Sequence, residues 1–256
     1  MPNLIDSHAH LDLLKDPATA LQEAAQNNVS YIVTVGIDLQ SSRLAVKSAA
    51  SDSRVLAAVG IHPNDSTQVT DEDISELARL AGSSKSVVAI GETGLDFYRD
   101  HCPRNLQEAA FITHIELARE TGLPIIVHSR EASEKVMALL DRHATGMNVI
   151  LHCFSLHDEV EACAERGYFM SIAGNVTFPK ATALRMAASK IPPGLLLTET
   201  DSPYLSPVPR RGKENSPANI PYILAELAGL RGISSATLAD QVYTNFHSAF
   251  NLSFPT

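Results

Sequence analysis

Short apolar runs recur along the chain, and each is followed by a polar turn and then by a stretch of helical character. Most of the runs are continuous rather than alternating, which is typical of strands buried on both faces of a parallel sheet. The runs predict eight strands, at Leu4–Ile5, Tyr31–Val35, Val55–Val59, Val87–Ile90, Ile125–Val127, Val149–Leu151, Tyr168–Ile172 and Leu195–Leu197.

Helix signals occupy the intervals between these runs. Asp16 and Pro17 stand in the order of an N-cap and a first-turn proline, which predicts a helix over residues 18–26. Gly122 follows an apolar-patterned segment at the point where a helix end favours a left-handed residue. The pattern predicts further helices at Asn105–Thr121, Glu131–His143, Asp158–Arg166, 217–230 and Ser235–Phe250.

Alternation of eight strands with helices predicts an α/β fold, a closed (β/α)8 TIM barrel, with a doubly wound open sheet as the alternative. The length of 256 residues fits one barrel domain spanning residues 1–256. The longest connection without a helix signal is Ser202–Ser216, which is rich in proline and basic residues. Long ordered loops on such scaffolds usually carry function.

Polar residues with metal-binding or acid–base chemistry end most of the predicted strands. In a barrel the carboxyl ends of all strands lie on one rim, where active sites form. The segments that reach this rim are Asp6–His10, Gly60–Pro63, Gly91–Gly94, His128–Arg130, His152–Phe154 and Glu199–Pro203.

His8 and His10 alternate along an extended segment, so both imidazoles face the same side. A single histidine at a strand end is more often a hydrogen-bonded structural residue than a ligand. Four imidazoles and two carboxylates at six rim positions instead predict ligands for two divalent ions. These six candidate ligands are His8, His10, Glu92, His128, His152 and Asp201, with Glu92 as the candidate bridge between the ions. His62 precedes a proline, and its role is open between substrate contact and strand capping.

The composition narrows the classes of function. With 45% hydrophobic residues, the chain is not intrinsically disordered, and a net charge of −9 disfavours broad adhesion to nucleic acid or anionic membrane. No apolar run approaches the roughly 20 residues of a membrane span. The N-terminal residues show no export signal, and three cysteines fit a reduced, cytoplasmic setting. Neither a P-loop nor a Gly-x-Gly-x-x-Gly motif supports a nucleotide cofactor.

The motifs together resemble those of the TatD-type metal-dependent deoxyribonucleases, over essentially the whole length. The matching stretches are Asp6–Asp12, Gly60–Pro63, Ala89–Tyr98, Pro124–Arg130, Leu151–Phe154, Glu199–Leu205 and Arg211–Pro217. The resemblance implies a TIM barrel of the amidohydrolase superfamily that hydrolyses nucleic-acid phosphodiesters, usually as a 3′-to-5′ exonuclease on single-stranded DNA. It implies that His8, His10, Glu92 and Asp201 hold one ion, and that Glu92, His128 and His152 hold the second.

The ligand set predicts a hydrolytic mechanism in which Asp201 and Glu92 are the catalytic candidates. Divalent ions lower the pKa of bound water, and Asp201 is placed to take its proton as a general base. Arg130, Arg211 and Lys213 are candidate contacts to flanking phosphates, although a solvated basic loop is an equal interpretation. Tyr98, Phe178 and Tyr204 are candidates for base stacking, with core packing as the alternative.

Two other classes of function remain open in the sequence. One is hydrolysis of a C–N bond in a cyclic amide, which would need a closed pocket in place of a cationic groove. The other is a metal-dependent binding protein without catalysis. The imidazoles favour Zn, Mn, Co, Ni or Fe over Mg, whereas the family resemblance suggests that Mg supports activity. The remaining expectations are one or two divalent ions, a DNA or RNA substrate, no membrane partner and a monomer.

Overall fold

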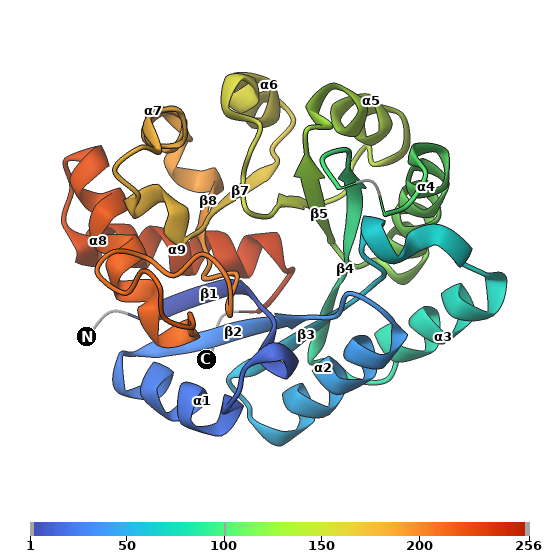
Figure 1. Ribbon diagram of the computed structural model, residues 1–256, viewed down its shortest axis with the longest axis horizontal. Coiled ribbons are helices and arrows are strands. Elements are labelled where there is room, and N and C mark those ends of the chain that lie inside the picture. Colours follow the sequence, from blue (N-terminus) through green and yellow to red (C-terminus); the bar gives the residue numbers. More distant parts are fainter. Residues whose placement is uncertain (1–2, 100, 254–256) are drawn as a thin grey trace. The chain divides into compact units, whose positions relative to one another are not determined.

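The computed structural model describes residues 3–99 and 101–253 (Figure 1). Its strands belong to one eight-stranded sheet in which β1 to β8 follow the order of the sequence. The chain divides into two compact units. We call residues 34–155 the central unit and the remainder, residues 3–33 and 156–253, the terminal unit.

The central unit alternates strands with helices throughout. After the end of β2 (Val29–Val35), its elements are α2 (Leu39–Ser51), β3 (Val55–Val59), η2 (Pro63–Gln68), α3 (Asp71–Ala81), β4 (Val87–Asp96), α4 (Arg104–Thr121), β5 (Ile125–Arg130), α5 (Ser133–His143) and β6 (Val149–Leu151). The strands β3 to β6 pair in parallel with their neighbours. In Figure 1, α3, α4 and α5 lie to one side of β4 and β5. The apolar residues of β3 to β6 are buried, as expected for a parallel sheet covered by helices.

Strand β4 is longer than the apolar run that predicts it. It continues through Glu92 to Asp96, with an irregular register against β5 between Ile90 and Thr93. Gly94 pairs with His128 at a positive φ of 133°, and a side chain there would collide with the His128 carbonyl. The close approach of the two strands therefore requires glycine, and it brings the polar end of β4 beside His128.

The terminal unit contains both ends of the chain. Its elements are β1 (Leu4–Ala9), η1 (Leu11–Leu13), α1 (Pro17–Gln26), the start of β2, η3 (His157–Glu159), α6 (Val160–Glu165), β7 (Phe169–Ile172), η4 (Gly174–Thr177), α7 (Thr182–Lys190), η5 (Pro193–Leu195), β8 (Leu196–Thr198), η6 (Pro217–Asn219), α8 (Ile220–Arg231) and α9 (Ser235–Ala249). Helix α9 packs against β1 and β8, where its buried Val242 and Phe246 join the core.

Two local predictions of helix ends are confirmed. The Asp16 carboxylate accepts a hydrogen bond from the Thr19 backbone N–H at 3.1 Å, and Pro17 is the first residue of α1. Gly122 ends α4 in the left-handed conformation with φ of 68°. Within the described residues, no helix combines the length and the apolar character that crossing a membrane requires.

Candidate metal centre

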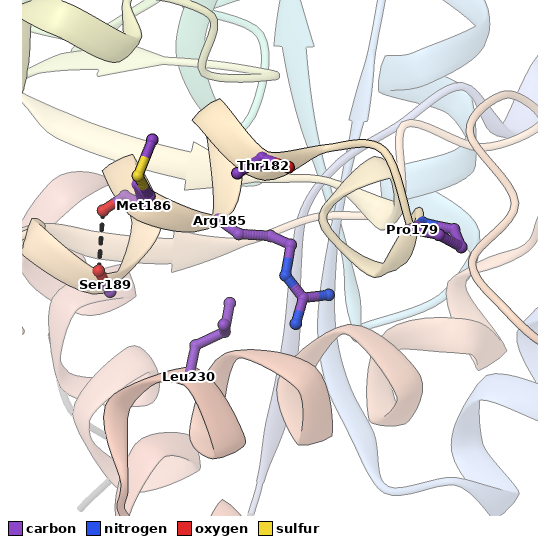
Figure 2. Close-up of a pocket in the computed structure, with 6 residues that line it drawn as sticks. All are labelled: Pro179, Thr182, Arg185, Met186, Ser189 and Leu230. Carbon is purple, nitrogen blue, oxygen red and sulfur yellow. Dashed lines mark hydrogen bonds between the residues drawn. The ribbon is translucent and has the colours of Figure 1, made fainter.

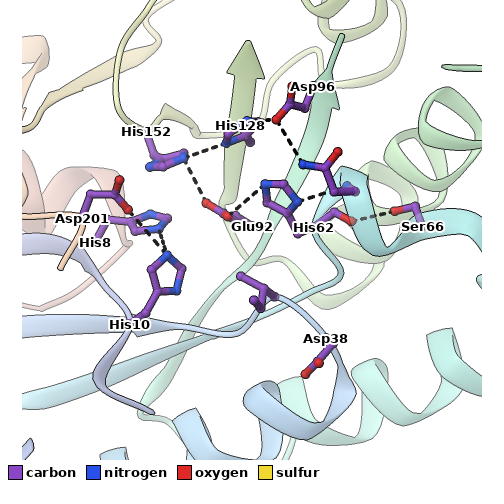
Figure 3. Close-up of polar contacts among 12 residues, drawn as sticks. His8, His10, Asp38, His62, Ser66, Glu92, Asp96, His128, His152 and Asp201 are labelled. Atoms are coloured by element: carbon purple, nitrogen blue, oxygen red, sulfur yellow. Dashed lines mark hydrogen bonds and ion pairs between the residues drawn. The ribbon is translucent and has the colours of Figure 1, made fainter. Parts of the chain in front are cut away.

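The predicted ligands of the terminal unit lie together at the ends of β1 and β8 (Figure 3). The Nε2 atoms of His8 and His10 are 3.3 Å apart, and His10 Nε2 is 3.6 Å from Asp201 Oδ1. Both imidazoles are buried. We call these three residues the terminal group.

Backbone hydrogen bonds fix the terminal group. The Asp201 N–H donates to the His8 carbonyl at 2.9 Å, and the His10 N–H donates to the Ser202 carbonyl at 2.8 Å. Asp201 has a positive φ of 53°, which turns the chain sharply after β8. The segment that carries the carboxylate is therefore paired directly with the segment that carries both imidazoles.

Asp6 stabilises the segment that precedes Asp201, a role that the sequence did not reveal. Its buried carboxylate accepts hydrogen bonds from the Thr200 N–H at 2.8 Å and the Thr200 hydroxyl at 2.6 Å. Burial is the main cause that raises the pKa of Asp6 to about 7, with the Glu199 charge adding to it and the hydrogen bonds opposing it. Asn215 holds the same loop by donating to the carbonyls of Thr200 and Tyr204.

The predicted ligands of the central unit form a second cluster, which we call the central group: Glu92, His128 and His152 (Figure 3). His152 Nε2 is 3.0 Å from Glu92 Oε2 and 3.1 Å from His128 Nδ1. One donor atom from each residue lies within 4.8 Å of the others. Glu92 and His152 are buried, so the cluster concentrates potential ligand atoms away from water.

His62 borders the central group, and its own hydrogen bond defines its chemistry. Nδ1 accepts from the Asn64 N–H at 3.1 Å and caps η2, so the ring proton of neutral His62 is on Nε2. Nε2 faces Glu92 Oε1 at 3.5 Å. Burial lowers the pKa of His62 to about 3, although Glu92 opposes the shift. His62 is thus a neutral donor as well as a cap.

Asp96 is the residue of this region whose role the sequence did not reveal. One carboxylate oxygen accepts from the backbone N–H groups of Tyr98 and Arg99, at 3.0 and 2.9 Å. The other accepts from the Asn64 amide at 3.1 Å and lies 3.5 Å from His128 Nε2. Burial works against ionisation, but these donors together hold the pKa of Asp96 well below its usual range. The available signal was its place four residues after Glu92 in a matched motif.

The spacing of donor atoms within each group suits a divalent ion. Two nitrogens that bind one tetrahedral ion at about 2.0–2.1 Å lie roughly 3.3 Å apart. The paired nitrogens of His8 and His10 are 3.3 Å apart, and those of His128 and His152 are 3.1 Å apart. Both pairs stand beside a carboxylate. The mixture of imidazole and carboxylate donors fits Zn or Mn better than Mg.

The predicted phosphate contacts are cations stacked on aromatic rings. The Arg130 guanidinium lies 3.9 Å from the centre of the Tyr98 ring, and that of Arg211 lies 4.2 Å from the Phe178 ring. Tyr98 is 58% exposed, which leaves most of its surface in water. Stacking orders each cation without neutralising its charge.

Lys213 lies in a mixed-charge part of the terminal unit. A hollow of about 490 Å³ is lined by Arg210 and Lys213, but Glu23 and Glu214 also line it. Glu214 pairs with Lys15 at 3.2 Å. The acidic neighbours reduce the positive potential of this loop, so the predicted phosphate contact at Lys213 stays a prediction.

A second hollow of about 540 Å³ lies between α7 and α8, and its lining includes none of the predicted site residues (Figure 2). Arg185 in its wall is paired with Glu226 at 2.6 Å, so its charge is already balanced. The lining residues are Pro179, Thr182, Arg185, Met186, Ser189 and Leu230. None of them has the donor chemistry of the two histidine-containing groups.

Comparison with known proteins identifies relatives along nearly the whole chain. A family model described as TatD related DNase matches residues 5–251. An uncharacterized metal-dependent hydrolase TatD of Mycobacterium tuberculosis is 38% identical over 260 residues, which cover 97% of this chain and 98% of that protein. A 3′-5′ ssDNA/RNA exonuclease TatD of Shigella flexneri is 36% identical over 250 residues, covering 94% and 95%.

The fold is similar to that of a solved relative. The crystal structure of YjjV, a TatD homologue from Escherichia coli, matches with a TM-score of 0.92 and 28% identity over 98% of each chain. Together with the eight parallel strands and their alternating helices, this likeness confirms the predicted (β/α)8 fold class. The prediction that residues 1–256 form one domain stays a prediction.

Proposed function

The chain belongs to the family of TatD-related DNases, and on this premise we propose that it is a metal-dependent nuclease that removes nucleotides from the 3′ end of single-stranded DNA. The family model and the relatives support a metal-dependent hydrolase. The observation that carries the proposal is the central group, in which a carboxylate and two imidazoles, mostly buried, offer converging donor atoms.

Each group would supply the ligands of one ion. His8, His10 and Asp201 would hold the first ion, and Glu92, His128 and His152 would hold the second. The donor spacings within each group support this assignment. When bound, such ions generate a nucleophile from water near neutral pH and stabilise the charge that develops on phosphate oxygens.

The side chains supply proton transfer and orientation. Asp201, a partly exposed carboxylate held at a sharp turn, accepts the proton of the attacking water. His62 keeps its proton on Nε2 and donates to a substrate oxygen. Its position beside Glu92 supports this assignment, and its lowered pKa keeps it neutral.

The strand of nucleic acid is positioned by the stacked cations. We assign flanking phosphates to Arg130 and Arg211, each of which is ordered by an aromatic ring. Lys213 adds a positive charge to the loop that carries Arg211. With a net charge of −9, long-range attraction does not draw a polyanion to this protein, so affinity depends on these few local contacts.

The decisive experiment uses fluorescently labelled single-stranded DNA. The chain is freed of metal with a chelator, and activity is measured before and after adding Mg²⁺, Mn²⁺ or Zn²⁺. A ladder of products shortened from the 3′ end, seen only with added metal, is the expected result. Intact DNA under every metal contradicts the proposal.

Two further substrates in the same assay distinguish the proposed function from the other candidate functions. A cyclic amide in place of DNA tests C–N hydrolysis, and RNA of the same sequence tests the preference for the sugar. Metal binding without turnover on any of the three substrates supports a binding protein instead. The native metal, the cytoplasmic location and the monomeric state stay predictions from the sequence.

A further inference from the structure

The residues around Asp96 leave its carboxylate little freedom. Its backbone N–H donates to the Gln107 side chain at 2.9 Å, and Gln107 donates back to the Asp96 carbonyl at 3.1 Å. The carboxylate is held by the N–H groups of Tyr98 and Arg99 and by the Asn64 amide. Asp96 is therefore a fixed negative charge beside the ring of His128.

The two nitrogens of His128 face different surroundings. Nδ1 points to His152 Nε2 at 3.1 Å, on the side of Glu92. Nε2 is buried and, within residues 3–99 and 101–253, has no hydrogen-bond partner of good geometry, while Asp96 Oδ2 lies 3.5 Å away. An N–H directed at that oxygen is attracted to it, whereas a lone pair is repelled. The carboxylate thus favours the ring form that carries its proton on Nε2.

We propose that Asp96 is a positioning residue that keeps the proton of His128 on Nε2 and so presents the Nδ1 lone pair to the metal ion. This inference deepens the proposed function, because it treats His128 as a ligand of that centre. A histidine ligand commonly donates its second ring N–H to a carboxylate, which fixes the ring and strengthens the donor. Here Asn64 and α4 in turn fix the carboxylate.

The competing interpretation is a separate cation site formed by His62, Asp96 and His128, whose donor atoms also lie within 4.8 Å of one another. His62 argues against it. Its Nδ1 already accepts the Asn64 N–H, so the neutral ring carries its proton on Nε2, the atom that such a site would need. The Asp96 oxygen nearest this cluster likewise accepts from Asn64.

The wild-type chain provides the first test, with no substitution required. The full-length protein, labelled with ¹⁵N-histidine and freed of metal, is examined at pH 8 by long-range ¹H–¹⁵N NMR, with His128→Gln used for assignment. We expect the His128 signals of a ring protonated on Nε2. Signals of a ring protonated on Nδ1 overturn the proposal.

The second test replaces the acceptor oxygen that faces His128 by a hydrogen-bond donor. In Asp96→Asn, the two backbone donors at Tyr98 and Arg99 keep the amide oxygen, so the amide nitrogen faces His128 and Asn64. The Asn64 amide can turn so that its Oδ1 accepts from this nitrogen. The ring then accepts at Nε2 and carries its proton on Nδ1. We expect this change of tautomer by NMR, and a loss of Zn²⁺ affinity of about 10- to 100-fold in competition with a chromogenic chelator.

Asp52→Asn is the matched control, because it removes one negative charge from an aspartate of the same unit that pairs with Arg54 instead of a histidine. It should change neither the His128 signals nor Zn²⁺ affinity. An unchanged tautomer or unchanged Zn²⁺ affinity in Asp96→Asn, with the fold retained by circular dichroism, overturns the role of Asp96. Failure of the wild-type chain to bind Zn²⁺ contradicts the metal centre instead, and the NMR result still decides the tautomer.

Discussion

Asp6 of the terminal unit and Asp96 of the central unit are both buried aspartates beside proposed metal ligands, yet they act on different parts of the chain. Asp6 accepts from Thr200 and thereby ties β1 to the loop after β8. Asp96 accepts from the turn that follows β4 and faces an imidazole. The Asp6 carboxylate joins two segments of the backbone, whereas the Asp96 carboxylate acts on the imidazole ring of a proposed ligand.

The pKa values of the two aspartates shift in opposite directions. Burial dominates at Asp6 and raises its pKa to about 7. At Asp96 burial acts in the same sense, but the combined donors outweigh it and lower the pKa. The sign of each shift therefore follows from the balance of two effects: burial outweighs the hydrogen bonds at Asp6, and the donors outweigh burial at Asp96. We expect substitution of Asp6 to change mainly the stability of the fold and substitution of Asp96 to change mainly metal binding.

The largest expected effect is on catalysis, at Asp201. Asp201→Asn keeps the shape of the side chain, and asparagine tolerates the positive φ at this position. It removes the proton acceptor and weakens one ligand, so turnover on single-stranded DNA should fall at least about 10³-fold. The metal-free melting temperature should equal or exceed that of the parent, because a charge among unneutralised ligands is lost.

The control for Asp201 is Asp16→Asn, which alters an aspartate of the same unit that caps α1. Asparagine is an equally good N-cap, so both turnover and melting temperature should stay close to the parent values. An Asp201→Asn protein that retains a tenth of the parental turnover removes this residue from the mechanism. An unfolded one makes Asp201 a structural residue.

The next effect is on stability, at Asp6. Asp6→Ala leaves the buried N–H and hydroxyl of Thr200 without their acceptor, and each unsatisfied group costs about 1–3 kcal/mol. We expect the free energy of unfolding in urea to fall by about 2–4 kcal/mol. Asp6→Asn keeps one acceptor oxygen and should lose no more than about 1 kcal/mol. Equal losses in the two variants would refute the hydrogen-bond explanation.

The positions of the strands could be predicted from the sequence, but some of their ends could not. Continuous apolar runs located all eight strands, because burial on both faces selects such residues. The ends of β1, β4 and β5 were missed, because residues 6–9, 91–96 and 128–130 include polar side chains but still continue the strands. An apolar pattern cannot locate the end of a strand when the last residues of that strand are polar residues of a functional site.

The supporting aspartates were hidden for a different reason. Both stand in motifs that the sequence singled out, but their partners come from distant segments, Thr200 for Asp6 and Asn64 for Asp96. Which ring nitrogen of His128 faces a carboxylate depends on the pairing of β4 with β5, where Asp96 lies opposite Arg130. These contacts depend on how the strands pair in three dimensions, and the spacing of residues along one strand gives no information about that pairing.

A smaller effect should distinguish the stacked cations of the two units. Arg130 is half-buried over Tyr98, whereas Arg211 is exposed over Phe178. An exposed ionic contact contributes about 0.2–1 kcal/mol, so Arg211→Ala should raise KM for DNA by roughly two- to fivefold with little change in kcat. Arg130→Ala should raise KM further, because its charge is less screened by water.

Lys213→Ala should behave as Arg211→Ala does, with a change in KM larger than the change in kcat. Arg104→Ala is the matched control, since Arg104 is exposed and stacks on Phe97 at 4.3 Å but has no assigned role. DNA binding by the parent should depend only weakly on salt, as expected for few phosphate contacts. Tight, steeply salt-dependent binding by the metal-free chain would contradict this picture.

The last prediction concerns His114, a neutral imidazole that supports the central unit from α4. Its Nε2 accepts from the Ile61 N–H at 3.1 Å, and Nδ1 lies 2.7 Å from the Ala110 carbonyl, to which it donates. Burial lowers the pKa of His114 to about 4, from 6.5 in the unfolded chain. Between these two values the unfolded state binds more protons than the folded state, so stability falls as the pH falls.

His114→Gln removes this titrating group and keeps an amide that can replace part of the hydrogen bonding. The free energy of unfolding in urea, measured for parent and variant from pH 4 to 6.5, should favour the parent increasingly as the pH rises. His101→Gln, which changes an exposed histidine of the same unit, should change the free energy of unfolding by less than about 0.5 kcal/mol. A difference between parent and His114→Gln that does not vary with pH would mean that burial does not keep His114 neutral.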